Sequence, residues 1–276
     1  MTHSNANASA NSSKLTPLLF ISHGAPTFAL EPGLMGPQLQ AIGQQLSGIQ
    51  AVLIVSPHWQ TSQVKVMTTA QPETIHDFGG FPPKLYTLQY PAKGHPELAS
   101  QAAQLLNNAG IITSLDDKRG LDHGAWVPMM HLLPQVNVPV FQVSIPYDWS
   151  PAKALAMGQA LAPLREQGVL IVASGSITHN LYDIQPPNSP IVAYANEFNQ
   201  WVKTAVLAHS VPAMLKYRTE APFAERAHPT DEHFLPIMVA MGATAPTEQA
   251  QYLNGGMSYG VLSMDAYGWG LPTSIQ

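Results

Sequence analysis

The chain has 276 residues, of which 45% are hydrophobic and only 11% are charged, with a formal net charge of −5. This length and composition suit one large globular domain that buries a substantial core. The charges are scattered, and the apolar runs fall far short of the roughly 20 residues of a membrane span, so neither nucleic acid nor a membrane is an expected partner. The absence of cysteine excludes thiolate metal sites and disulfides and agrees with a cytoplasmic location.

The N-terminal segment differs in composition from the rest. Residues 1–14 (MTHSNANASANSSK) are polar and low in complexity, which predicts a disordered leader. The segment has no apolar core of the kind that secretory signals carry. We therefore expect one domain over residues 15–276, while the sequence does not define an oligomeric state.

In chain order, apolar and β-branched runs predict buried strands at residues 18–21, 51–55, 64–67, 138–145 and 169–173. Helical spacing of apolar residues predicts helices between them, over residues 39–46, 96–110, 150–168 and from about 191. Strands that alternate with helices and are apolar on both faces indicate an α/β fold. We expect a three-layer sandwich with a central, mostly parallel or mixed sheet, in a single domain.

Three of these strands run into a histidine. LLFISHG ends at His23, AVLIVSPHW at His58 and VLIVASGSITHN at His179. In an open parallel sheet the ligand crevice lies outside the carboxyl ends of the strands, so these side chains are expected to converge there. One histidine at a strand end is usually structural, but three in equivalent positions indicate a metal site with positions left open for substrate.

The segment HPTDEHFLP, residues 228–236, gathers two histidines and two carboxylates in a chain with little charge. Its histidines are five positions apart with a proline between them, so they do not form an i, i+4 ligand pair. The pattern predicts a loop entering a helix. Thr230 or Asp231 would cap that helix, and Glu232, His233 and Phe234 would form its first turn.

Two further histidines lie in loop-like contexts. His123, in RGLDHGAWVP, is flanked by Asp122 and Gly124, which predicts a tight loop. His76, in TIHDFGGFPPKLY, lies in a segment rich in glycine, proline and aromatic residues that either covers an aromatic ligand or simply forms a turn. The sequence contains no GxGxxG, P-loop, HExxH or GxSxG motif, so the common nucleotide and hydrolase sites are not indicated.

Six motifs together resemble the class III extradiol ring-cleavage dioxygenases, and in particular the branch of 4,5-DOPA dioxygenase extradiol-like proteins. They are SHGAP, VSPHW, IHDFGGFP, RGLDHGAWVP, SGSITHNL and HPTDEHFLP, and the likeness runs from Leu18 to Trp269. The resemblance implies a non-haem metal enzyme that uses O2 to cleave the ring of a catechol such as DOPA, giving a semialdehyde.

The resemblance also implies a ligand set. His23 and His58 would bind the metal together with a third ligand from HPTDEHFLP, for which we select His233, with Glu232 as the alternative and His228 as the least favoured candidate. Fe(II) is expected for activity. A histidine in place of the carboxylate of other family members makes the ligand set more positive and better suited to zinc, so Zn(II) could also occupy the site.

For catalysis, the resemblance assigns His179 as the base that removes a proton from a catechol hydroxyl, and His123 as the residue that orients the substrate and donates a proton. His76, Asp77 and Phe81 are expected to wall the substrate pocket. Two other functions stay open from the sequence, namely a Memo-type non-catalytic binding protein and a zinc-dependent hydrolase on the same fold.

Overall fold

A computed structural model describes residues 15–272 of the chain. A central eight-stranded sheet has the order β4-β3-β5-β2-β6-β1-β10-β7. Its strands are β1 (Leu18–Ser22), β2 (Ala51–Thr61), β3 (Val64–Met67), β4 (Thr113–Asp116), β5 (Val140–Pro146), β6 (Val169–Gly175), β7 (Gln251–Leu253) and β10 (Ala266–Trp269). A separate hairpin pairs β8 (Met257–Ser258) with β9 (Leu262–Ser263). The leader predicted at residues 1–14 lies outside the described residues.

The middle of the sheet is parallel and its edges are mixed. Strands β5, β2, β6 and β1 pair in parallel, whereas β10 and β7 add antiparallel strands at one edge and β3 pairs antiparallel with β5. All residues of β1, β5 and β6 are buried, as the apolar runs predict for strands covered on both faces. The predicted mostly parallel or mixed sheet is therefore confirmed.

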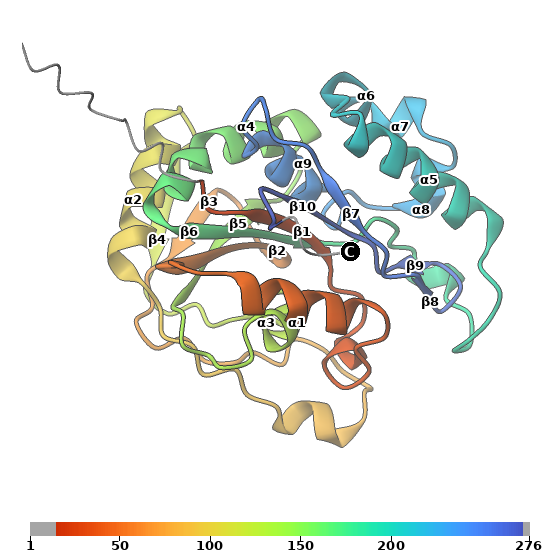
Figure 1. The fold of residues 1–276 in the computed structure, drawn as a ribbon, viewed down its shortest axis with the longest axis horizontal. Coiled ribbons are helices and arrows are strands. Elements are labelled where there is room, and N and C mark those ends of the chain that lie inside the picture. The colour runs from red at the N-terminus through yellow and green to blue at the C-terminus, as the bar shows by residue number, and fades with distance from the viewer. Residues whose placement is uncertain (1–14, 273–276) are drawn as a thin grey trace, which may run out of the picture.

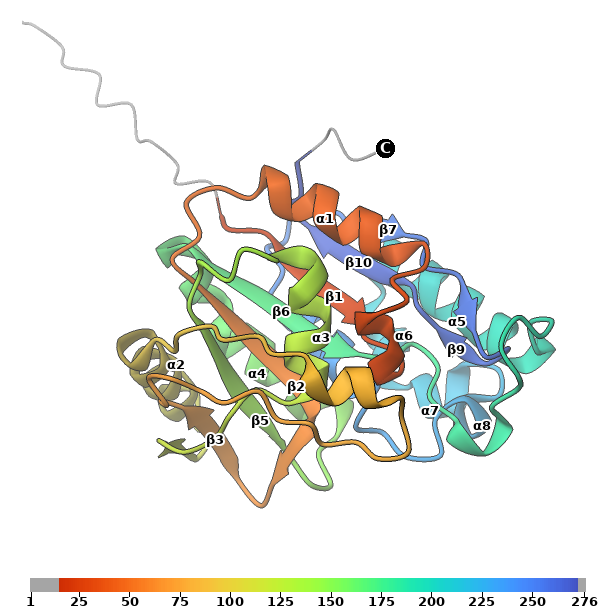
Figure 2. The same cartoon turned by 90° about the horizontal axis from the view of Figure 1, so that it is seen from below.

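Helices form the two outer layers (Figures 1 and 2). Helices α1 (Met35–Gln45) and α3 (His123–Leu132) cover one face. The other face carries α2 (Pro96–Asn108), α4 (Pro151–Leu161) and α9 (Leu235–Gly242), beside the group α5 (Ala193–Leu207), α6 (Val211–Leu215), α7 (Tyr217–Glu220) and α8 (Ala224–Ala227). Short 3-10 helices are η1 (Pro26–Ala29), η2 (Pro83–Thr87), η3 (Ala162–Gln167) and η4 (Leu181–Asp183). This arrangement confirms the three-layer α/β sandwich.

Glycines set the position of α9 against its neighbours. A Cβ on Gly158 of α4 would lie 2.0 Å from the Val239 carbonyl oxygen, so the two helices pack backbone to backbone. At the other end of α9, a Cβ on Gly175 of β6 would lie 2.5 Å from the His233 carbonyl oxygen. Because no side chain separates these backbones, the segment that carries His233 is held directly against the carboxyl end of β6.

Two elements end at clearly different residues from those that the sequence predicts. The helix expected up to residue 168 ends at Leu161 and continues as η3, because the following residues tighten into 3-10 geometry before Gly168 at φ +79°. Strand β2 does not stop before His58; it continues to Thr61 through an irregular register between Val55 and Gln60. Such an irregularity re-aims side chains, here at the sheet edge where His58 lies.

Within residues 15–272, no helix has both the length and the apolar character that crossing a membrane requires.

Candidate metal centre

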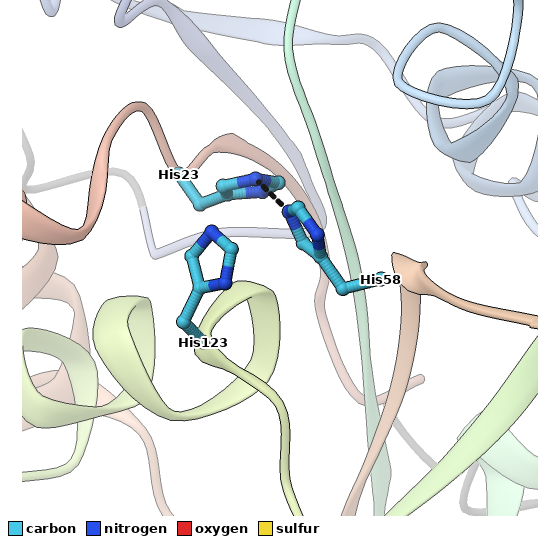
Figure 3. Close-up of side chains that lie close together, drawn as sticks. All are labelled: His23, His58 and His123. Carbon is cyan, nitrogen blue, oxygen red and sulfur yellow. Dashed lines mark hydrogen bonds between the residues drawn. The ribbon is translucent and has the colours of Figure 1, made fainter. Parts of the chain in front are cut away.

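His23 and His58 meet at the carboxyl edge of the sheet. His23 follows β1 directly, and its Nε2 lies 3.1 Å from Nε2 of His58 (Figure 3). Nδ1 of His23 lies 2.9 Å from the hydroxyl of Ser174, which itself donates its proton to the Gly124 carbonyl at 2.5 Å. The hydroxyl must therefore accept from Nδ1–H, which leaves Nε2 of His23 as the nitrogen with a free lone pair.

Burial keeps both of these imidazoles neutral. Burial lowers the pKa of His23 well below its usual value, and the neighbouring histidines lower it further. Burial and His123 lower the pKa of His58 to about 3, although Asp77 acts in the opposite direction. Because a metal ligand must be unprotonated, the pair is ready to bind a cation at neutral pH.

His233 adds a buried nitrogen that has no hydrogen-bond partner. Its Nδ1 lies 3.1 Å from Oε1 of Glu232, whereas its Nε2 is buried and has no hydrogen-bond partner. Burial, followed by the charges of the surrounding histidines, lowers its pKa well below the usual value. A buried nitrogen without a partner is destabilising unless a hydrogen-bond donor or a cation satisfies it. A carboxylate behind the other ring nitrogen is the usual support of a metal-bound histidine.

The segment before α9 differs from its prediction. Glu232, His233 and Phe234 form a turn, and the helix begins only at Leu235. No side chain caps this helix, because the Asp231 carboxylate accepts hydrogen bonds from Tyr217 and Arg218 instead. The predicted loop is correct, but the predicted cap and first turn are wrong.

Ring spacing separates two alternative ligand triads that share His23 and His58. Imidazoles bound to one ion at about 2.1 Å radiate outward, so their ring centres lie roughly 5 Å apart. The centres of His23, His58 and His233 are 5.0, 5.0 and 5.5 Å apart. His123 also has a nitrogen within reach of the pair, but its ring centre is only 3.8 Å from that of His58. The spacing of the ring centres favours His233, whereas the ligand atoms that lie within 4.8 Å of one another are those of His23, His58 and His123.

His179 and Glu232 form a second cluster with His233, with ligand atoms within 4.8 Å of one another. The rings of His179 and His233 are stacked, with centres 3.5 Å apart and planes 8° apart. The lone pairs of stacked rings lie in parallel planes and do not converge on one ion. Burial lowers the pKa of His179 to about 4 despite the opposing charge of Glu232, so His179 is a neutral imidazole beside the triad.

His123 is not in a tight loop, as the sequence suggested, but is the first residue of α3. The flanking Asp122 is the helix cap, accepting a hydrogen bond from Ala125 N–H at 3.3 Å. Asp77 accepts the backbone N–H of His123 at 2.9 Å, and its other oxygen lies 3.0 Å from Nδ1 of His123. Burial raises the pKa of Asp77, but hydrogen bonding and charge from His123 outweigh it and lower the value to about 2.

The segment with His76, Asp77 and Phe81 contacts the site through Asp77 and through Phe78. The Phe78 ring centre lies 5.7 Å from that of His123 and 5.5 Å from that of Phe81. His76 stands further back, because its Nε2 contacts the Leu88 carbonyl at 2.9 Å and its ring packs against Phe78 at 5.8 Å. Asp77 supports two histidines, since it also lies 3.6 Å from Nδ1 of His58.

Sequence reasoning missed two residues of this centre. Ser174, which orients His23, is a lone hydroxyl in the apolar run VLIVASG, and a polar residue at that place was the available signal. Phe78 was passed over because its contact with His123 joins segments far apart in the sequence. His228, named with HPTDEHFLP, is buried, but its Nε2 is bonded to the Ile177 carbonyl at 2.7 Å, so that nitrogen is not free to bind a metal.

The fold and the site together define an α/β protein with a cluster of histidines at the carboxyl edge of its sheet that could hold a metal ion. Residues 18–262 match the family described as the catalytic LigB subunit of aromatic ring-opening dioxygenase. The chain therefore belongs to this family of metal-dependent extradiol dioxygenases, as the six motifs suggested, and it is a ring-cleaving oxidoreductase. The comparison thus favours neither the non-catalytic binding protein nor the zinc hydrolase that the sequence left open.

Relatives cover nearly the whole chain. The 4,5-DOPA dioxygenase extradiol of Beta vulgaris is 38% identical, over 90% of this chain and 94% of its own length. The Escherichia coli K12 protein of the same name is 36% identical, over 92% of this chain and 94% of its own length. A crystal structure of an uncharacterized Escherichia coli K12 protein has a TM-score of 0.76 at 31% identity, over 92% of this chain and 99% of that one.

Proposed function

We propose that the enzyme cleaves a catechol such as DOPA next to its diol, with O2 as co-substrate, to give a ring-opened semialdehyde. Two relatives carry the name 4,5-DOPA dioxygenase extradiol at 38% and 36% identity. The observation that carries the proposal is the bare, buried Nε2 of His233, close to the His23–His58 pair whose Nε2 atoms lie 3.1 Å apart. Three imidazole nitrogens at one centre suit a metal with positions left for substrate.

We propose His23, His58 and His233 as the ligands, with Fe(II) for activity and Zn(II) as an ion that can occupy the same site. The three Nε2 atoms and the spacing of their rings fit such an ion, with the proton between the His23 and His58 nitrogens displaced when it binds. Glu232 is the weaker alternative, because its Oε1 lies against Nδ1 of His233 and accepts a hydrogen bond from Thr230 at 3.0 Å. When bound, iron would acidify a coordinated hydroxyl and carry electrons between the catechol and O2.

His179 is the base in this proposal. Its pKa of about 4, lowered first by burial, leaves the ring unprotonated at neutral pH and able to accept a proton from a catechol hydroxyl. One face of the ring is covered by His233 at 3.5 Å. An imidazole nitrogen accepts a proton in the plane of its ring, so a ring held by this stacking restricts the orientation of the substrate hydroxyl.

His123 and Asp77 form the proton-donating side. The Asp77 carboxylate, with a pKa of about 2, remains ionised and favours a proton on the adjacent Nδ1 of His123. This arrangement leaves Nε2 as the nitrogen of His123 that would contact the substrate, and Nε2 must take up a proton from the reacting catechol before it can donate one. Phe81 and His76, together with Phe78, would line the aromatic side of the substrate pocket next to His123.

Anaerobic loading with Fe(II), followed by DOPA, catechol or protocatechuate in air, tests this function directly. A yellow ring-opened product should appear with matching consumption of O2. The zinc-loaded protein is the control and should be inert, because zinc has no redox change to offer. Inertness of the iron-loaded protein across a broad panel of catechols would overturn the proposal.

We also propose that the enzyme acts in the cytoplasm. The cysteine-free sequence is compatible with that compartment, since it has no disulfide that an oxidising environment would need to maintain. Fractionation of cells with an antibody against the chain would test this, and recovery in an extracytoplasmic fraction would contradict it.

A further inference from the structure

His228 is a buried histidine that the proposed reaction does not use. It has 0% exposure, and its Nε2 lies 2.7 Å from the carbonyl oxygen of Ile177. A carbonyl only accepts, so Nε2 carries the proton, and Nδ1 is buried without a partner. The ring is packed among aromatic side chains, with Phe234 at 5.2 Å and Phe198 at 5.6 Å between ring centres. His228 therefore has one fixed orientation and one hydrogen bond to give.

The recipient of that hydrogen bond lies in the segment that carries His179. Residues 176–180 connect β6 to η4 and belong to neither a strand nor a helix. Backbone hydrogen bonds join this segment to residues 226–233, from Ser176 N–H to the His233 carbonyl at 2.9 Å and from His179 N–H to the Ala227 carbonyl at 2.8 Å. The position of His179 thus depends on contacts between two loops.

Ile177 links these loops to the sheet. Its carbonyl accepts the proton of His228, while its N–H donates to the hydroxyl of Ser22 at 3.3 Å, one residue before His23. Ile177 is thus restrained on both sides of its Cα, at its N–H by Ser22 and at its carbonyl by His228. Removing the His228 bond would leave a buried carbonyl unpaired and would release one of these two restraints.

We propose that His228 is a positioning residue, which holds residues 176–180 so that the His179 ring stays in register with His233. The inference rests on the proposed role of His179 as base. His228 acts on the reaction only through Ile177 and donates to no substrate. Its loss should therefore lower turnover while the three metal ligands keep their nitrogens free.

Two substitutions separate the hydrogen bond from the volume of the side chain. His228→Gln keeps an amide N–H that can reach Ile177, whereas His228→Leu removes the donor. We expect kcat to fall by about 100-fold in the leucine variant, since a displacement of about 1 Å at a catalytic group has that effect. The glutamine variant should recover most of the loss. KM and the dissociation constant for Co(II), measured by chelator competition, should change by no more than roughly 3-fold in either.

His131 offers a matched control. It is also a histidine whose Nε2 contacts a carbonyl, that of Phe28, at 2.8 Å, but it lies in α3. His131→Leu should lower the melting temperature as His228→Leu does, yet leave kcat within about 2-fold. An equal fall in kcat in both leucine variants would show that His228 has only a structural role, and would overturn the inference.

Hydrogen exchange gives a readout that does not depend on turnover. Backbone amides of residues 176–180 should exchange faster in His228→Leu than in the wild type and be protected again in His228→Gln. Unchanged exchange, or unchanged kcat, in the leucine variant would overturn the inference. If His228→Leu does not fold, His228→Asn, which is too short to reach Ile177, replaces it with the same expectations. If the iron-loaded wild type is inert with catechols, but amide exchange of residues 176–180 still changes with the His228 substitutions, only the proposed function is refuted.

Discussion

The two sides of the histidine centre are built differently. His23 and His58 lie on or directly after strands β1 and β2, in the part of the sheet with parallel pairing. His179 and His233 lie in segments without regular structure, joined by backbone hydrogen bonds between the loops. The strand side owes its geometry to the packed sheet, whereas the loop side owes it to a few specific bonds. The strand side should therefore tolerate the loss of one hydrogen-bonded neighbour better than the loop side.

The largest effect is expected from removing a ligand. His23→Ala and His233→Ala should each lower affinity for Zn(II) by more than about 1,000-fold, because two imidazoles hold a cation much more weakly than three. Isothermal titration of the metal-free protein measures this. Glu232→Ala is the control and should lose only about 10- to 100-fold as a supporting residue. The reverse order for His233 and Glu232 would show that the carboxylate is the ligand.

The next effect concerns the base on the loop side. His179→Ala should retain Zn(II) affinity within about 3-fold but lose about 100- to 10,000-fold in kcat of the iron enzyme, the range for removal of a general base. Steady-state oxygen uptake with a saturating catechol measures the loss. A variant that turns over at the wild-type rate would remove His179 from the mechanism.

A smaller effect is expected on the strand side. Ser174→Ala removes the acceptor that orients Nδ1 of His23 and should weaken metal binding by about 10- to 100-fold. Ser144→Ala is a matched control, because Ser144 is also buried and hydrogen-bonded, to Thr61 at 2.7 Å, but lies in β5. Equal metal affinity in both variants would show that the sheet alone orients His23.

The smallest effect is in the pH dependence of stability. The pKa of His228 is lowered, first by burial, to about 3, against about 6.5 in an unfolded chain. Between these values only the unfolded chain binds the proton, so stability is fully present above pH 6.5 and falls as the pH drops toward 3. His228→Gln should make the fall shallower by about 1.4 kcal/mol per pH unit. Urea titrations of the metal-free wild type and His228→Gln at pH 5 and 6 measure how the free energy of unfolding changes with pH. The same change in both proteins would contradict a buried, neutral His228.

The sequence predicted the fold and the strand side of the centre well because both follow from local patterns. Apolar runs with a histidine at their end locate His23 at the sheet edge, and the same reasoning brings His58 there despite the irregular end of β2. The loop side was predicted less well. The turn at Glu232 and His233, the Asp231–Arg218 ion pair and the bond from His228 to Ile177 depend on which segments meet in space. Residues such as Asp122 could have been recognised as a helix cap, but the contact of Phe78 with His123 has no local signal.

The central claim is that one metal ion binds at His23, His58 and His233. Crystals of the zinc-loaded protein, measured on both sides of the zinc absorption edge, locate the ion and its ligands together. The account predicts a single anomalous peak within about 2.1 Å of Nε2 of all three histidines. A peak bound by His123 or by the Glu232 carboxylate in place of His233 would contradict it.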